Sequence, residues 1–420
     1  PANVALTAYG LMEFQDMAKV HNIDAGVIKR TRDWLLDKRS PNGSWKTGDR
    51  RFGPAWRGDY AMTAYVAWSV YQGMSNASGE REKTRSFLMS RSPKQIRNPY
   101  ILALTCNALL ALDSSGASAD AYLRELESLQ KSDGKLGWWS QSPNQQTMFY
   151  GAGQSGDVET TSLAVLALLK ANRGFAQTRA AVSWLIKQKG QHGTWYSTQA
   201  TVLALKALTE SAAKSQAQPK ERKIEIALGD AIKRSITIST DQAEVMQQID
   251  LSSHLKSGLQ LLNVKELTET QTGFQVMFRY HIPERKQKPR QGFAVSVAYD
   301  RTETTVGKPI QAMATIGNQT DDSVPMVMVN LPVPAGFRVD ENVLQKWRAD
   351  RVIDKFERTS RGVTLYVREI KSNAALSLKY SLTPTMPVKV AVPGAKAYAY
   401  YNPSTRGVSQ SSRLIVAELK

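Results

Sequence analysis

Apolar and polar residues follow two different periods along the chain. Residues 1–213 carry apolar residues at the spacing of α-helices, whereas residues 222–420 alternate apolar and polar residues, as strands do. The polar segment SAAKSQAQPKERK at 211–223, which contains Pro219, separates the two halves. The pattern therefore predicts a helical domain followed by all-β structure.

The helical half is repetitive. A residue suited to cap a helix is followed four positions later by Thr and then by an almost wholly apolar run; the pairs are Asn3/Thr7, Asp59/Thr63, Asp157/Thr161 and Ser197/Thr201. Asn, Asp and Ser accept hydrogen bonds from the free N–H groups of a first helical turn, so each pair predicts the start of a buried inner helix. Segment 98–112 predicts a fifth inner helix with a different start.

Amphipathic segments alternate with these runs and predict outer helices at 27–39, 80–91, 119–130 and 178–188. Three of them end in a glycine-containing turn that is closed by a tryptophan, namely Trp45, Trp138 and Trp195. The alternation predicts a ring of helical hairpins, an α/α toroid, with a linear solenoid as the competing geometry. If the ring needs six hairpins, about three helices are missing on its N-terminal side.

The second half predicts strands separated by Gly, Pro and Asp or Asn, at 223–239, 273–283, 292–302, 309–319, 323–333, 363–370, 376–384 and 395–403. A helical pattern at 340–349 interrupts them, and ERKQKPR at 284–290 is a linker. The expected fold class is multidomain α plus all-β. It comprises an incomplete toroid at 1–213, a short β domain at 222–283 and a β-sandwich with one helix at 291–420.

Composition narrows the function classes. The 420 residues carry a net charge of +18, yet no zinc-finger spacing, RNP-type strand or basic heptad region indicates nucleic-acid binding. No apolar run approaches the ~18 residues that would predict a membrane span. The start PANVALTAYG lacks the basic and apolar regions of a signal peptide and lies inside an apolar pattern, which suggests a piece of a longer protein.

Several strings resemble, in order, the C-terminal part of the alpha-2-macroglobulin and complement thioester-protein family. They are LTAYGLMEFQDM (6–17), WLLDKRSPNGSW (34–45), DVETTSLAVLALL (157–169), TWYSTQATVLALKAL (194–208), FRYHIP (278–283), PVPAGF (332–337) and AYAYYNP (397–403). The resemblance implies a thioester domain, the trailing part of a CUB-type β domain and a receptor-binding β-sandwich. It also implies a protease inhibitor rather than an enzyme, placed outside the cell or in a bacterial cell envelope or periplasm. Its partners would be trapped proteases and the upstream macroglobulin domains of the same chain.

In that family, a Cys and a Gln in a Gly-Cys-Gly-Glu-Gln sequence form an internal thioester that acylates the attacking protease. The motif is absent here and is expected upstream, where the helices are missing; a lineage without a thioester is the alternative. Some members place a nucleophilic His in the loop that corresponds to 46–58, which contains none. The resemblance therefore implies reaction with lysine amines rather than with carbohydrate hydroxyls.

The resemblance also implies aromatic residues that shield the thioester. The candidates are Trp45, Phe52 and Trp56 in the helical half and Tyr366, Tyr398, Tyr400 and Tyr401 in the sandwich, with plain core packing as the alternative for each. In a strand, Tyr398 and Tyr400 would share one face and Tyr401 would lie on the other. The helix at 340–349 corresponds to a receptor-binding helix that uses paired lysines, but here Lys346 is its only lysine.

Other candidate residues give weaker evidence of a functional site. Cys106, the single cysteine, lies in an apolar run and predicts a buried thiol rather than a nucleophile. The histidines His21, His192, His254 and His281 are scattered, so no metal or other cofactor is expected. Asp157 and Glu159 could do proton chemistry, but helix capping and the helix dipole are the simpler explanation and are preferred.

Two alternative functions remain open. Glycine–x–Trp turns on an α/α toroid also resemble terpene cyclases and prenyltransferases, which need an Asp-rich motif or a zinc site that this sequence lacks. A non-covalent binding module, made of a basic toroid and a sandwich, is the other alternative.

Overall fold

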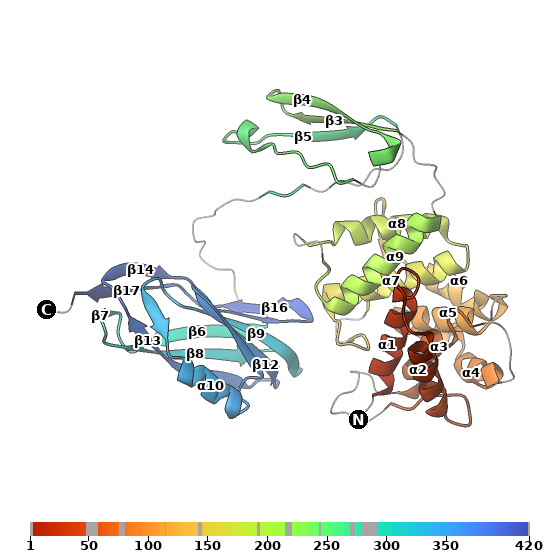
Figure 1. Cartoon of the computed structure of the whole chain (residues 1–420), viewed down its shortest axis with the longest axis horizontal. Coiled ribbons are helices and arrows are strands. Elements are labelled where there is room, and N and C mark those ends of the chain that lie inside the picture. The colour runs from red at the N-terminus through yellow and green to blue at the C-terminus, as the bar shows by residue number, and fades with distance from the viewer. Residues whose placement is uncertain are drawn as a thin grey trace. The chain divides into compact units, whose positions relative to one another are not determined.

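The computed structural model describes residues 3–47, 58–74, 80–113, 115–141, 145–190, 194–214, 221–242, 245–268, 274, 276–278 and 292–418. The chain divides into two compact units, of which the first joins Pro1–Glu210 to Glu284–Lys420 and the second is Ser211–Pro283. The first unit contains a helical domain and a β-sandwich, and the second contains a small sheet (Figure 1).

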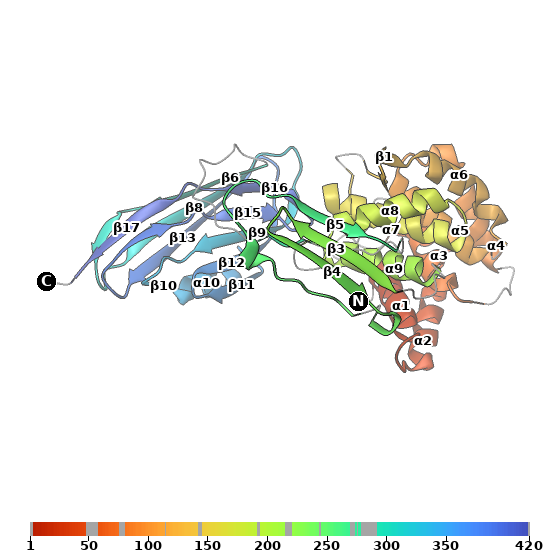
Figure 2. The same cartoon turned by 90° about the horizontal axis from the view of Figure 1, so that it is seen from above.

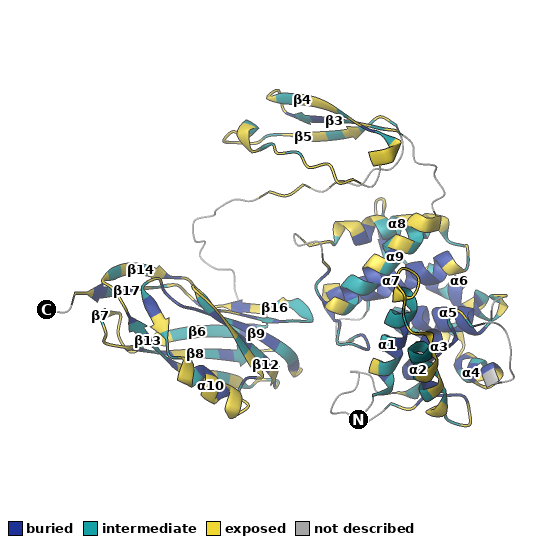
Figure 3. Cartoon of the chain, viewed as in Figure 1, coloured by how far each residue is buried: buried dark blue, intermediate teal, exposed yellow. Residues whose placement is uncertain are grey.

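The helical domain alternates inner and outer helices, as predicted. The inner helices are α1 (Val4–Met17), α3 (Asp59–Tyr71), α5 (Pro99–Leu112), α7 (Gly153–Lys170) and α9 (Thr198–Lys214), and the outer ones are α2 (Ala25–Asp37), α4 (Glu80–Met89), α6 (Asp120–Ser128) and α8 (Phe175–Lys187). Every residue of α5 from Leu102 onward is buried, whereas α2 buries only Leu35 (Figure 3). Helices that are apolar all round are therefore central, and amphipathic helices cover them.

The row of inner helices curves back on itself. Lys206 on α9, the last inner helix, pairs with Asp16 on α1, the first, at 2.6 Å. The Lys206 ammonium also lies 5.4 Å from the ring centroid of Trp68 on α3. The two ends of a linear solenoid would not meet, so the toroid prediction is confirmed. Within the described residues the ring has the five inner and four outer helices expected.

Three tryptophans complete the C-terminal turns of outer helices. The indole N–H of each donates to a carbonyl in the last turn, at 2.6 Å from Trp45 to Leu35, 2.6 Å from Trp139 to Leu126 and 2.7 Å from Trp195 to Leu185. The last carbonyls of a helix lack the usual intrahelical partner, so each indole adds a hydrogen-bond donor at a buried helix end. The carbonyls of Leu126 and Leu185 also accept from the N–H groups of Leu129 and Gln188, at 3.2 Å each. Each indole is at most 1% exposed.

The repeated threonine binds the same tryptophans from the next inner helix. The Trp backbone N–H donates to the Thr hydroxyl oxygen at 2.9 Å for Trp45 and Thr63, 3.1 Å for Trp139 and Thr161, and 2.9 Å for Trp195 and Thr201. One hydroxyl thus joins an inner helix to the turn after the preceding outer helix. This explains why Thr recurs at a fixed place in the repeat.

Two details of the predicted repeat are wrong. Trp139, not Trp138, closes the middle turn; Trp138 lies at the end of strand β2 (Leu136–Trp138) and stacks on Trp184 with centroids 6.0 Å apart. Asp59 and Asp157 do not cap their helices. Their carboxylates accept from Thr47 N–H at 3.1 Å and Gln141 N–H at 3.2 Å, two residues past the closing tryptophans.

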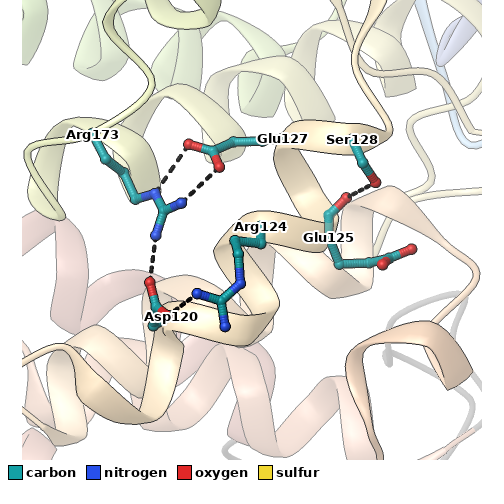
Figure 4. A network of polar contacts seen from close by, with 6 residues as sticks. All are labelled: Asp120, Arg124, Glu125, Glu127, Ser128 and Arg173. Atoms are coloured by element: carbon teal, nitrogen blue, oxygen red, sulfur yellow. Dashed lines mark hydrogen bonds and ion pairs between the residues drawn. The ribbon is translucent and has the colours of Figure 1, made fainter.

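An arginine fixes the outer helix α6 to the turn that follows α7 (Figure 4). Arg173 donates to both carboxylate oxygens of Glu127, at 3.0 and 2.8 Å, and to Asp120 at 2.5 Å. Arg124 pairs with the other Asp120 oxygen. The planar guanidinium matches a carboxylate in two places, which sets the orientation of α6 as well as its distance.

The sandwich packs two larger sheets around one core. Their orders are β10-β13-β8-β6 and β11-β12-β9-β15-β16, and a third sheet, β14-β17-β7, flanks them. The strands are β6 (Phe293–Tyr299), β7 (Glu303–Thr305), β8 (Ile310–Asn318), β9 (Val324–Pro332), β10 (Phe337–Val339), β11 (Lys355–Thr359), β12 (Gly362–Ile370), β13 (Ala375–Pro384), β14 (Val388–Val392), β15 (Lys396–Ala399), β16 (Asn402–Val408) and β17 (Ser412–Ala417). The predicted helix is α10 (Glu341–Ala349), which buries Leu344 and Trp347 against this core.

The second unit is a three-stranded sheet in which β3 (Arg222–Leu228) lies between β4 (Ile232–Ile238) and β5 (Leu262–Glu266) (Figures 1 and 2). The sequence did not predict β5. The predicted strand at 273–283 is not found in its described residues, Phe274 and 276–278, which are more than half exposed and therefore lack the burial that stabilises a strand. The rest of that segment lies outside the described residues. None of the described helices is long and apolar enough to cross a bilayer.

The Trp–Thr pair predicts a specific loss of stability. In Thr161→Val, the buried Trp139 N–H keeps its place but loses its acceptor, so we expect the free energy of unfolding to fall by about 1–3 kcal/mol. Urea unfolding followed by tryptophan fluorescence measures this. Thr178→Val is the matched control, because the buried Thr178 hydroxyl has no hydrogen-bond partner among the described residues. Equal losses in the two variants would contradict the assignment.

Candidate functional site

Tyr401 joins the sandwich to the helical domain within the first unit. It lies on the turn between β15 and β16, and its ring stacks on that of Tyr150 with centroids 5.7 Å apart and planes 30° apart. The backbone N–H of Ala152 donates to the Tyr401 carbonyl at 3.4 Å. Gly153 completes the contact, because a Cβ there would lie 2.7 Å from Asn402 Oδ1.

Residues 147–151, which we call the Tyr150 loop, form a closed turn before α7. Thr147 N–H donates to the Gly151 carbonyl at 2.8 Å, and Gly151 N–H donates to the Thr147 hydroxyl oxygen at 2.8 Å. Tyr150 N–H donates to the Thr147 carbonyl at 3.1 Å. Tyr150 has a φ of +68°, a left-handed conformation that is costly outside glycine, so the rest of the loop must hold it there.

The loop is anchored on its inner side by an aromatic cluster. Phe149 lies between two tyrosines of the inner helices, with ring centroids 5.8 Å from Tyr9 and 5.6 Å from Tyr65. Tyr100 on α5 contributes its hydroxyl, which accepts from Met148 N–H at 3.4 Å. The contact with the sandwich is therefore built on side chains from three inner helices.

Glu159 lies beneath the loop, on α7, and is fully buried. Burial raises its pKa to about 8, and the neighbouring Thr147 hydroxyl offsets only part of that effect. Asp157, on the same helix, also has a raised pKa because of burial, which its bonds to Ser140 and Gln141 partly offset. The two acids differ in their surroundings, since the carboxylate oxygens of Glu159 lack a hydrogen-bond partner among the described residues.

The other predicted sandwich tyrosines lie elsewhere. Tyr366 on β12 and Tyr398 on β15 flank Met328 in register, so they share one face of the five-stranded sheet. Lys355 lies 5.2 Å from the Tyr366 ring centroid. Strand β15 ends at Ala399, so the expected alternation of faces does not reach Tyr400, which lies edge-on to Tyr401 at 5.2 Å.

The remaining predicted residues are spread over the chain. Trp45 is fully buried in the helical core, and Phe52 and Trp56 lie outside the described residues. Lys346 is exposed on α10. Cys106 is fully buried, and burial raises its pKa far above the ordinary range of a thiol. The described residues contain no cluster of three or more His, Cys, Asp or Glu that could hold a metal ion.

Sequence reasoning missed Tyr150, Thr147 and the role of Gly151 and Glu159. A signal existed in the string FYGAGQSG at 149–156, where three glycines lie just before and in the first turn of an apolar inner helix. A Cβ on Gly151 would meet Glu159 Oε1 at 2.2 Å, which shows that this glycine permits a close approach. Glycines clustered before a buried acid therefore marked the site.

Sequence models of known domain families match both the helical ring and the sandwich. The sequence model of the A-macroglobulin TED domain matches residues 1–211, and that of the A-macroglobulin receptor binding domain matches residues 322–412. The chain therefore belongs to the alpha-2-macroglobulin and complement thioester-protein family. The resemblance found in the sequence is confirmed.

Curated relatives agree over nearly the whole chain. Ovostatin of Gallus gallus is 25% identical over 431 residues, which cover 97% of this chain and 28% of ovostatin. Complement C3 of Oncorhynchus mykiss is 26% identical over 432 residues, which cover 94% of this chain and 25% of C3. The chain thus spans about a quarter of the length of these relatives.

Solved structures agree in fold. The native conformation of E. coli alpha-2-macroglobulin aligns with a TM-score of 0.62 and 14% identity, over 99% of this chain and 25% of that chain. Salmonella alpha-2-macroglobulin reacted with methylamine aligns with a TM-score of 0.60 and 16% identity, over 99% of this chain and 26% of that chain.

The Tyr150–Tyr401 stack predicts a local effect on hydrogen exchange. An aromatic pair contributes about 0.5–1.5 kcal/mol, so Tyr401→Ala should speed exchange of the Ala152 amide about 2- to 10-fold. Exchange measured by mass spectrometry on a peptide that covers 145–153 tests this. Tyr398→Ala is the control, since Tyr398 lies beside Met328 on the face of the sheet and should leave that peptide unchanged. An equal effect of both variants would contradict the role of Tyr401.

Proposed function

We propose that this chain is the C-terminal portion of an alpha-2-macroglobulin-like, broad-spectrum protease inhibitor. It traps proteases after they cleave a bait region, covalently if the parent protein carries a thioester upstream. In this proposal the helical domain is the remainder of the thioester domain and the sandwich is the receptor-binding domain. The three-stranded sheet is the trailing part of a CUB-type domain. The carrying observation is the order of TED and receptor-binding domains in one chain.

The proposed reaction is an acyl transfer. A lysine amine of the protease attacks the thioester carbonyl, an amide bond forms, the carbon–sulfur bond breaks and the amine proton passes to the departing thiolate. A thiolate is a good leaving group, so the bond keeps its acylating power while water is excluded. The absence of His from 46–58 favours amines over hydroxyls. Salmonella alpha-2-macroglobulin, which shares this fold, has been solved after reaction with methylamine, and this supports amine reactivity in that relative.

Exposed apolar residues support an upstream partner within the same parent chain. Leu6 on α1 and Leu205 on α9 are 52% and 50% exposed, although both belong to inner helices at the two ends of the ring. In the second unit, Met246, Leu259 and Leu261 are at least 74% exposed. Upstream helices and macroglobulin domains would cover these surfaces and remove their apolar area from water.

Further parts of the proposal follow from the family. We place the parent protein outside the cell or in a bacterial cell envelope or periplasm, and we propose that it is not an enzyme and needs no cofactor. Shielding of the thioester is assigned to Tyr401 first, because Tyr401 meets the helical domain through Tyr150. Lys346 alone does not supply a paired-lysine receptor site.

The proposal predicts a covalent conjugate. The full-length parent, mixed with an active serine protease, should yield a cross-linked species on denaturing gels whose tryptic peptides contain a Gln–Lys amide by mass spectrometry. Treatment with methylamine beforehand should abolish it, because the small amine consumes the thioester. Protease inactivated at its nucleophile is the control and should give no conjugate.

The alternatives give different results. A parent that yields no conjugate but still blocks cleavage of large substrates is a non-covalent cage. A parent that does neither would refute the inhibitor proposal. Turnover of an isoprenoid diphosphate would instead support the alternative that the chain is part of an enzyme similar to terpene cyclases and prenyltransferases.

A further inference from the structure

Glu159 is a buried acid on α7 that takes no part in the hydrogen bonds of the Trp–Thr repeat. It has no exposed surface, and neither carboxylate oxygen has a hydrogen-bond partner among the described residues. Buried charges in proteins are normally paired or hydrogen-bonded, because an isolated ion loses its hydration. An unpartnered carboxyl at this place therefore requires a physical account.

The carboxyl touches the underside of the Tyr150 loop. A Cβ built on Gly151 would lie 2.2 Å from Glu159 Oε1 and 2.7 Å from Thr147 Oγ1, so the backbone, the hydroxyl and the carboxyl are packed together. Only glycine fits at this position. The distance between the Tyr150 loop and α7 therefore depends on the hydrogen-bond partners that the Glu159 carboxyl requires. The position of Tyr150 against Tyr401 depends on the same requirement.

The groups that face Glu159 cannot neutralise a negative charge. They are Tyr65 from α3, Tyr100 from α5 and Tyr401 from the sandwich, and the charge of Glu159 contributes to the raised pKa of each tyrosine. Asp157, the other acid on this part of α7, binds Ser140 and Gln141 instead. Among the described residues, no lysine or arginine contributes to the pKa of Glu159, so the carboxyl stays neutral near pH 7.

An ionised carboxylate would need hydrogen-bond donors. The nearest candidates are the Thr147 hydroxyl and the Gly151 N–H, and the loop is closed by the bond that Gly151 N–H donates to the Thr147 hydroxyl oxygen at 2.8 Å. The Thr147 hydroxyl can donate its own proton to one carboxylate oxygen without losing this bond. The second oxygen must take the Gly151 N–H or draw in water, and either change breaks the closure. The closed loop, which includes the bond from Tyr150 N–H to the Thr147 carbonyl, helps to hold Tyr150 at its costly φ of +68°, so opening the loop favours relaxation of Tyr150 away from its stacked position.

We propose that Glu159 is a proton-controlled support for the contact between the helical domain and the sandwich. Its neutral carboxyl holds the Tyr150 loop closed with Tyr150 against Tyr401, and its ionisation opens the loop and loosens that contact. The support acts within this chain, whether or not the parent protein carries a thioester. Its failure would therefore leave the proposed inhibitor function untouched.

The direction in which the stability of the closed loop changes with pH follows from the raised pKa of Glu159. The folded carboxyl binds its proton up to about pH 8, whereas an unfolded one releases it near 4.5. The folded state holds more protons between these two values, so the closed loop loses stability progressively as the pH rises through this range, and the loss levels off above about pH 8, where both states are ionised. Below pH 8, opening of the loop should therefore become up to about tenfold more frequent with each pH unit.

Hydrogen exchange of the 420-residue chain tests the proposal. Exchange of a peptide that covers 145–153 is measured from pH 6 to 9 and divided by that of the synthetic peptide, which cancels the intrinsic pH dependence of exchange. We expect a ratio that rises from pH 6 by up to about tenfold per pH unit and levels off near pH 8, with a parallel rise in a peptide that covers 399–403. A flat ratio in the native chain overturns the proposal.

Three variants test whether Glu159 causes the rise in exchange with pH. Glu159→Gln keeps the shape without the charge and should remove the rise, whereas Asp157→Asn, a neutralised acid on the same helix, should retain it. A rise that persists unchanged in Glu159→Gln overturns the proposal. If that variant does not fold, Thr147→Val replaces it, because this variant lacks the hydroxyl that closes the loop. Its exchange should be fast already at pH 6 and should not rise further with pH, and an unchanged rise would overturn the proposal.

Discussion

The helical domain depends on one recurring hydrogen-bonded unit, in which a tryptophan after an outer helix meets a threonine on the next inner helix. The indole N–H satisfies a terminal carbonyl of the outer helix, and the threonine hydroxyl satisfies the backbone N–H of the same tryptophan. Both bonds are buried, so losing either leaves an unpaired polar group in the core. The unit fixes three of the four described outer helices, α2, α6 and α8, to the inner helix that follows each of them.

Much of this ring could be predicted from the sequence. The wholly apolar runs and the amphipathic segments gave the inner and outer helices within a few residues, since hydrophobic period reports which face of a helix is buried. The repeated Thr and Trp were visible as well, but their pairing was not. Asp59 and Asp157 resemble caps by position, yet they bind backbone N–H groups across a turn, which a local rule does not consider.

The candidate site was harder to predict, because its parts come from distant segments. Tyr401 was among the expected shielding residues, but its neighbour Tyr150 lies in a different domain and in a loop with no periodic pattern. Strand alternation, which ranks Tyr398 with Tyr400, fails where β15 ends at Ala399. Of the four candidate tyrosines, Tyr401 is the one that stacks on Tyr150. This tertiary contact cannot be derived from a rule that considers only residues adjacent in the sequence.

A buried acid inside an aromatic cluster is also what a toroid enzyme would use as a proton donor. Such an enzyme needs an open cavity, so that the reacting atom comes within hydrogen-bond distance of the acid. At Glu159 that space is filled, since the Gly151 backbone leaves no room even for a methyl group beside the carboxyl. A raised pKa alone therefore does not identify a catalyst. Here the acid touches a loop rather than a cavity, so in the proposal a proton gained or lost acts on the loop and on its contact with the sandwich rather than on a bound substrate.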